Sequence, residues 1–220
     1  MTNETKVLIG IGVATLVIVV AATFLIGGKS NSNAQVNTEP VANAEALVRS
    51  NSHKIEVKGA KITFVEFGDI QCPACGAAFP VVQQLLGDYK GKLTFAFRQF
   101  PLQMHQNAQP AANAAEAAGV QGKFFEMVDK MYENQAEWSE SKTPMDIFTK
   151  YAQQLKLDVK KFKDDATKKK YQKNIDADIK DGFAVGVNAT PTFYINGVKQ
   201  EGGIDYQTYK AQFDKILNSK

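Results

Sequence analysis

The chain contains two cysteines, separated by two residues in the segment Cys72-Pro73-Ala74-Cys75. A disulfide between such close neighbours would stabilise a fold only slightly, because the entropy that a cross-link removes from the unfolded chain grows with loop length. Reversible exchange between dithiol and disulfide needs a thiolate with a second thiol in reach, and this spacing provides both. The pair therefore predicts redox chemistry rather than a structural cross-link.

The residues around the pair indicate how a thiolate would form. An apolar extended segment, residues 61–67, comes before the pair, and a helical segment begins at Cys72. Pro73 suits the first helical turn, where no amide hydrogen is needed. The free amides and the positive end of the helix would face Cys72 and lower its pKa below the value of about 8.5 for a free cysteine. Cys75, one turn further on, is expected to be buried and less reactive.

A zinc site is the alternative for the two cysteines. The chain has two histidines, but His53 lies 19 residues before the pair and His105 lies 30 residues after it. Neither distance matches the paired spacing of zinc fingers or zinc ribbons. We therefore expect no metal here. We interpret His105, beside Gln106 and Asn107, as a structural or surface residue near a helix start rather than a catalytic one.

Glu66 is the only acidic residue in the apolar run from Ile62 to Phe67, six residues before Cys72. A carboxyl group buried in that strand would have a raised pKa and would be able to exchange protons with Cys75. The alternative is a glutamate at a strand edge that points into water. We favour the buried position.

Thr190-Pro191 stands directly before another apolar extended run. Proline cannot donate a hydrogen bond to a sheet, so Pro191 is expected at the start of that strand. The Xaa-Pro bond is the kind of peptide bond in which the cis isomer costs little. A cis bond would hold the backbone of Thr190 against the disulfide, where it is free to pair with an extended substrate chain.

The rest of the pattern predicts a sheet with a helical insertion. A first helix from Cys72 is expected to kink at Pro80 and end at Gly87, and Asn196-Gly197 predicts a hairpin turn. The expected strands are residues 54–57, 61–67, 93–100, 192–195 and 198–201. The further expected helices are residues 108–118, 123–134, 144–155, 161–183 and 206–217. A parallel crossover followed by an antiparallel hairpin and a helix is an α/β plan.

The N-terminal segment is predicted to be a membrane anchor. Residues 7–28 are uncharged and almost wholly apolar, and as a helix they would extend roughly 30 Å, the thickness of a bilayer core. A cleaved signal would have a shorter apolar region, and either interpretation directs the domain to export. The expected organisation is an anchor at 1–29, a flexible linker at 30–41 and a domain at 42–220 with its helical insertion at about 104–185. We therefore expect a single-pass protein of the cell membrane with its catalytic domain outside the cytoplasm.

Charge disfavours nucleic acid as a partner. The 26 Lys and Arg residues are interspersed with 23 Asp and Glu residues, which gives a net charge of only +3. The densest basic run comprises Lys168, Lys169, Lys170 and Lys173 and is followed by Asp176, Asp178 and Asp181. We interpret this stretch as a solvated helix face.

Several segments together resemble the DsbA-like thiol:disulfide oxidoreductases of the thioredoxin superfamily. They are Phe64-Val65-Glu66-Phe67, Cys72-Pro73-Ala74-Cys75, Pro80, and Gly186-Val187-Asn188-Ala189-Thr190-Pro191-Thr192-Phe193. The likeness spans roughly residues 55–217 and implies an α/β thioredoxin-like fold with a helical insertion, here preceded by one N-terminal transmembrane helix.

The resemblance also implies roles for the site residues. Cys72 becomes the exposed cysteine that forms the mixed disulfide, and Cys75 becomes its buried partner. Glu66 falls at the buried acid position of the family, and the bond between Thr190 and Pro191 is expected to be cis. In the active-site loop, Ala74 stands where the best-known member has a histidine that would further stabilise the thiolate, so a milder oxidant is expected.

The implied function is the introduction of disulfides into exported proteins, without a cofactor and by a monomer. Reduced exported proteins would be the substrates, and a quinone-linked membrane protein would reoxidise the enzyme. A reductase or isomerase remains an alternative. The best-known member has valine at the position of Thr190, whereas threonine there resembles the disulfide isomerases and many anchored Gram-positive relatives. A non-catalytic thioredoxin-like chaperone is a second alternative.

Overall fold

The structure is a computed structural model, and it describes residues 39–41 and 43–219. The predicted membrane span at 7–28 lies outside that part, as does the linker up to residue 38. Among the described residues, no helix combines the length and the apolar character needed to cross a bilayer.

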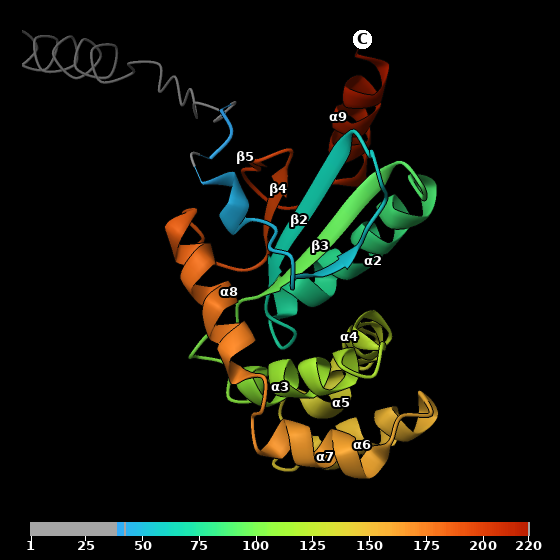
Figure 1. The fold of residues 1–220 in the computed structure, drawn as a ribbon, viewed down its shortest axis with the longest axis vertical. Coiled ribbons are helices and arrows are strands. Elements are labelled where there is room, and N and C mark those ends of the chain that lie inside the picture. The colour runs from blue at the N-terminus through green and yellow to red at the C-terminus, as the bar shows by residue number, and fades with distance from the viewer. Residues whose placement is uncertain (1–38, 42, 220) are drawn as a thin grey trace, which may run out of the picture. The chain divides into compact units, whose positions relative to one another are not determined.

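Five strands form one sheet in the order β1-β3-β2-β4-β5 (Figure 1). The strands are β1 (His53–Ile55), β2 (Ile62–Gly68), β3 (Leu93–Gln99), β4 (Thr192–Ile195) and β5 (Val198–Lys199). β2 and β3 run parallel, and the other neighbouring pairs are antiparallel. The turn between β4 and β5 has positive φ at both Asn196 and Gly197 (48° and 85°), as a two-residue hairpin requires. The predicted crossover and hairpin are therefore both present.

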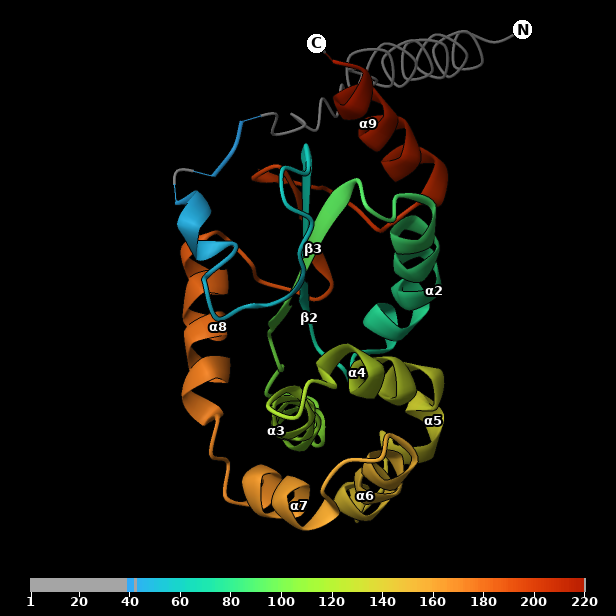
Figure 2. The same cartoon turned by 45° about the vertical axis from the view of Figure 1, so that its right-hand side comes forward.

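Helices cover both faces of this sheet and extend beyond one end of it (Figures 1 and 2). They are α2 (Pro73–Asp88), α3 (Ala108–Gly119), α4 (Phe124–Glu133), α5 (Gln135–Trp138), α6 (Pro144–Gln154), α7 (Val159–Thr167), α8 (Gln172–Ala184) and α9 (Tyr206–Asn218), with the short 3-10 helix η1 (Ala44–Ala46) before β1. The helical insertion, α3 to α8, interrupts the chain between β3 and β4, as predicted.

Side chains of β2 alternate between two apolar layers. Ile62 and Phe64 pack in the larger core, which includes residues of α2, α9 and the insertion. Val65 and Phe67 pack on the opposite face in a smaller core with residues of η1 and the segment that follows α8. Burial on both faces explains why β2 has a continuous apolar sequence, since each face has its own cover.

The predicted helix over 161–183 is wrong, because two helices, α7 and α8, occupy that stretch. Lys169 has a φ of 50° and ends α7, while the Lys170 amide bonds to the Asp165 carbonyl at 3.0 Å. This is the Schellman helix end, which usually has glycine at the residue with positive φ. A lysine in that position gave no signal in the sequence.

The first helix also ends later than predicted. α2 contains Pro80 and continues past Gly87 to Asp88. Tyr89, which follows it, is buried and packs edge-on against Phe213 of α9, with ring centroids 5.1 Å apart. That packing holds the last turn of α2 against α9, so Gly87 does not end the helix.

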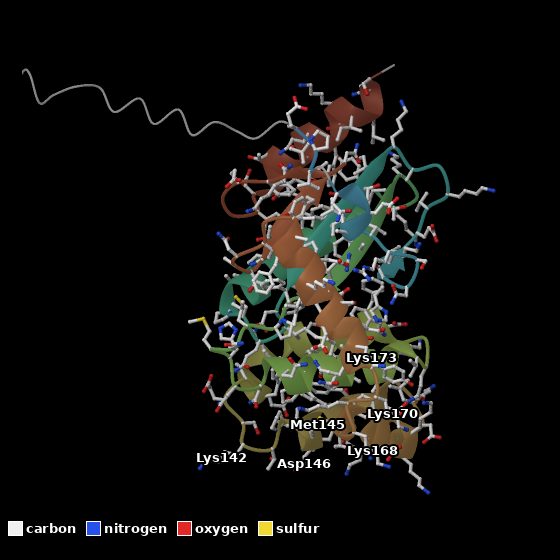
Figure 3. The ribbon with its side chains drawn as sticks, turned by 60° about the vertical axis from the view of Figure 1, so that its left-hand side comes forward. Lys142, Met145, Asp146, Lys168, Lys170 and Lys173 are labelled. Atoms are coloured by element: carbon white, nitrogen blue, oxygen red, sulfur yellow. The ribbon has the colours of Figure 1, made fainter. Side chains whose placement is uncertain are left out.

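The basic run does not form one solvated helix face. Lys168 and Lys170 lie at the turn between α7 and α8, where both form ion pairs with Asp164, and Lys173 follows on α8 (Figure 3). Two of the acidic residues that follow do not belong to a solvated face either, because Asp178 and Asp181 accept hydrogen bonds from the buried Arg98 of β3. No pattern around Arg98 indicated that this cation is buried.

Candidate active site

Cys72 stands at the junction between β2 and α2. It is the N-cap of α2 in an extended conformation (φ −61°, ψ 124°), and Pro73 begins the helix, as predicted. In its thiol form, Cys72 Sγ donates a hydrogen bond to the Thr190 carbonyl at 3.4 Å, and the peptide bond between Thr190 and Pro191 is cis. The structure therefore brings together the two cysteines and the loop before β4, which are far apart in the sequence.

The surroundings of Cys72 favour its anionic form. A hydrogen bond from the Cys75 thiol is the largest contribution, and together with the others it lowers the pKa of Cys72 to about 5, although burial acts in the opposite direction. Hydrogen bonds from the backbone amides of Cys75 and Ala74 also lower it, and the nearby Thr190 side chain contributes in the same direction. Cys72 is therefore largely a thiolate at neutral pH, which is the nucleophilic form of the group.

Cys75 has the opposite character. Burial, followed by the hydrogen bond that it donates to Cys72, raises its pKa well above the ordinary cysteine value. The exposed fraction is 0% for Cys75 and 6% for Cys72. The expectation of an exposed Cys72 is thus wrong in degree, because the Thr190 backbone lies against its sulfur. Pro73 and Ala74 between them are exposed.

Glu66 is buried in the centre of the sheet, so the strand-edge alternative does not apply. Its neighbours across the sheet are Phe97 of β3 and Phe193 of β4. Burial, with a smaller contribution from the charge of Cys72, raises the pKa of Glu66 to about 8. The carboxyl also lines an apolar pocket of about 300 Å³. At neutral pH it is largely protonated, and when it is ionised its charge contributes to raising the pKa of Cys75.

Polar side chains of the helical insertion hold the loop that leads to Cys72. Gln135 donates from Nε2 to the carbonyls of Ile70 (2.8 Å) and Cys72 (3.1 Å). Gln71 donates to the Ser139 carbonyl at 2.6 Å and accepts from the Asn107 amide at 2.6 Å. Sequence reasoning missed these contacts. The available signal was the group of polar residues that follows each of the two parallel strands, because such ends meet at one edge of a sheet.

The two histidines lie in separate places, each against one carboxylate. His53 bonds to Glu116 at 3.0 Å, and His105 bonds to Asp69 at 2.6 Å. In the part of the chain that the structure describes, no three His, Cys, Asp or Glu side chains gather where they could hold a metal ion.

Comparison with known proteins gives a family. Residues 51–215 match the family described as Thioredoxin. A curated relative, the Na(+)/H(+) antiporter NhaA 1 of Salinispora arenicola, is 37% identical over 153 residues, which are 69% of this chain and 22% of the relative. The chain thus spans about a fifth of the length of the curated relatives it matches.

Solved structures share the fold. A thioredoxin-like oxidoreductase from Silicibacter pomeroyi has a TM-score of 0.68 and 23% identity, and the likeness covers 81% of this chain and 100% of that one. The thiol-disulfide exchange protein alpha-DsbA2 of Wolbachia pipientis has a TM-score of 0.68 and 20% identity, with 79% of this chain and 91% of that one covered. At these identities the likeness concerns the fold, which is that of the DsbA-like proteins.

Proposed function

The chain belongs to the thioredoxin family, and from that membership we propose that it is a thiol:disulfide oxidoreductase that introduces disulfides into other proteins. The observation that carries the proposal is the asymmetry of the cysteine pair. Cys72 has a pKa of about 5, whereas the pKa of Cys75 is raised. A stabilised thiolate favours the reduced enzyme and makes its disulfide oxidising.

The reaction would begin with the disulfide form of the enzyme. A substrate thiolate attacks Cys72 Sγ, a bond forms between the two sulfurs, and the bond between Cys72 and Cys75 breaks. The electron pair of the broken bond leaves on Cys75, which takes a proton because its pKa is high. Glu66, protonated at neutral pH, is the group that supplies this proton, and it recovers one from solvent.

A second substrate thiolate then attacks the substrate sulfur of the mixed disulfide. Cys72 leaves as a thiolate, and its hydrogen bonds to the amides of Ala74 and Cys75 stabilise that leaving group. The substrate loses two electrons and two protons and gains a disulfide. The enzyme gains the two electrons, one proton remains on Cys75, and the other enters solvent.

We propose reduced exported proteins as the substrates and a quinone-linked membrane protein as the acceptor of the two electrons. Residues 7–28 would anchor the chain in the cell membrane, with the catalytic domain outside the cytoplasm. Protease treatment of intact cells or spheroplasts tests this arrangement, since a domain on the outer side is digested while a cytoplasmic control protein is not. Protection of the domain would contradict the proposed location.

Oxidative refolding of a reduced disulfide protein such as hirudin tests the activity. We expect the wild-type protein to accelerate disulfide formation and Cys72→Ser to fall to the uncatalysed rate. Cys75→Ser is the matched variant, because it keeps the nucleophile and is expected to accumulate a mixed disulfide with the substrate. Catalysis by Cys72→Ser would contradict the mechanism. An acceleration of refolding that persists without disulfide exchange would favour a non-catalytic chaperone role.

An isomerase or reductase is the second candidate, and Thr190 before Pro191 is the residue that favours it. Equilibration with glutathione separates the candidates. A reduction potential near the thioredoxin value of about −270 mV would contradict the oxidase proposal.

A further inference from the structure

Both histidines of the chain bond to a buried carboxylate. Of the two carboxylates, Asp69 is close to Cys72 in the sequence and Glu116 is not. The His105 side chain is 19% exposed and that of Asp69 is 0% exposed. The His53 side chain is 23% exposed and that of Glu116 is 2% exposed. The two pairs are therefore closely matched in burial and chemistry. Only the first includes a residue of the turn that leads to Cys72.

Asp69 connects that turn to the loop after β3. Its Oδ1 accepts a hydrogen bond from the Gln71 amide at 2.8 Å. Its Oδ2 accepts from the Leu102 amide at 2.9 Å and from His105 Nδ1 at 2.6 Å. A carboxylate offers only acceptors, so Nδ1 carries the hydrogen in this bond. One buried side chain thus receives three donors from two separate segments.

The backbone of Asp69 closes the same turn. Its carbonyl accepts from the Cys72 amide at 3.0 Å. The position of Cys72 relative to the first turn of α2 therefore depends on where Asp69 is held. The amides of Ala74 and Cys75 reach the sulfur only from that position, and hydrogen bonds weaken steeply when their angle or distance departs from the optimum.

We propose that Asp69 and His105 form a positioning pair that keeps the Cys72 sulfur on the amides at the start of α2, and so sets how strongly the disulfide oxidises. Neither residue contacts the substrate in this proposal. His105 fixes the Asp69 carboxylate, and Asp69 fixes the turn. The inference rests on the proposed thiol:disulfide exchange and extends it to residues outside the cysteine motif.

The test compares His105→Leu, which removes the donor, with His105→Gln, which retains one. His53→Leu is the matched control, because it breaks the other histidine–carboxylate pair. The reduced proteins are titrated by thiolate absorbance to give the pKa of Cys72, and each is equilibrated with glutathione. Urea unfolding of each variant records the loss of stability separately.

We expect His105→Leu to raise the pKa of Cys72 by about one unit, which makes the protein about tenfold less oxidising against glutathione at neutral pH. His105→Gln should recover much of this shift. His53→Leu should lose stability without moving either redox quantity. Asp69→Asn presents an amide group to donors that need an acceptor. If this variant folds, it should shift the pKa of Cys72 more than His105→Leu does.

Two results would overturn the inference. One is a His105→Leu protein whose Cys72 pKa and glutathione equilibrium match those of the wild type. The other is an equal shift in His53→Leu, since that would make the effect a general consequence of lost stability. Failure of the proposed function is recognised separately, because the wild-type protein would then show no turnover of hirudin whatever the variants do.

Discussion

The sheet and the helical insertion contribute to the candidate site in different ways. The sheet and its connections supply titratable groups with shifted pKa values, which are Cys72, Cys75 and Glu66. The insertion supplies neutral amides. That of Gln135 bonds to carbonyls of the loop that leads to Cys72, and that of Asn107 bonds to carbonyls at the end of α5 and in the segment that follows it. Changes in the first region should therefore move pKa values, and changes in the second should move stability.

The largest expected effect is the dependence of stability on pH that Glu66 imposes. Its pKa is about 8 in the folded protein and 4.5 ordinarily, so between these values the folded state holds a proton that the unfolded state has lost. The contribution of Glu66 is complete below pH 4.5 and is lost as the pH rises through 8. The total loss in the free energy of unfolding across this pH range is about 5 kcal/mol for the reduced protein.

Urea unfolding across this range, for wild type and for Glu66→Gln, measures that contribution. The difference between the two free energies of unfolding should change by several kcal/mol from low to high pH. Glu126→Gln on the surface of α4 is the control. In this variant the free energy of unfolding should still fall as the pH rises. A difference that is flat across the range would contradict a protonated, buried Glu66.

Arg98 links the two regions, and its loss should cost about 3–5 kcal/mol, because Asp178 would remain largely buried without its cation. Asp181 would keep only its ion pair with Arg49. Its side chain is 0% exposed and bonds to Asp178 (2.8 Å) and Asp181 (2.6 Å) of α8 and to two carbonyls of the segment containing η1. Arg98→Met should unfold at much lower urea concentration but keep the pKa of Cys72.

Arg49 provides the matched control for Arg98. It bonds to the same Asp181, yet its side chain is 42% exposed. Arg49→Met is expected to cost less than about 1 kcal/mol, as exposed ion pairs do. An equal loss of stability in Arg49→Met and Arg98→Met would show that burial does not set the energy of this network.

In the insertion, Asn107 tests whether the neutral side-chain amides affect the stability of the fold. Its Nδ2 donates to the carbonyls of Trp138 (3.1 Å), Ser139 (2.9 Å) and Ser141 (2.9 Å). Asn107→Ala should cost about 1–3 kcal/mol, because those carbonyls lose a buried donor. Asn107→Asp should cost more at neutral pH, because a carboxylate offers only acceptors, and should recover as the pH falls. Asn134→Asp, at an exposed site, should show neither effect in urea unfolding.

The same contrast explains what the sequence could predict. Continuous apolar runs and turn residues predicted β2, β3 and the hairpin at Asn196, and the chemistry of cysteine pairs predicted the place of Cys72 at the start of α2. The polar residues that follow β2 and β3 indicate only that such side chains gather at one edge of the sheet. The individual partners of Asp69, Gln71 and Gln135 could not be predicted, because polar side chains have no periodicity that reveals them. The end of α7 was missed for a local reason, since a lysine adopts the conformation that glycine usually marks.

The smallest expected effect comes from the hydroxyl of Thr190. In the thiol form described here, Thr190 Oγ1 is buried and makes no hydrogen bond of ordinary geometry to the described residues, yet the same side chain contributes to the lowered pKa of Cys72. The two observations agree if the hydroxyl donates to the sulfur once the thiolate forms. Thr190→Val should therefore raise the pKa of Cys72 by up to about one unit.

Thr190→Val should at the same time increase the free energy of unfolding of the thiol form slightly, because an unpaired buried hydroxyl is removed. Thr192→Val is the matched control, since Thr192 Oγ1 donates to the Ala189 carbonyl at 2.7 Å and its loss should reduce stability while leaving the pKa of Cys72 unchanged. Thiolate absorbance and urea unfolding on both variants measure the two quantities. A Thr190→Val protein that loses stability and keeps the pKa of Cys72 would mean that the hydroxyl serves the fold, as the insertion does, and not the sulfur.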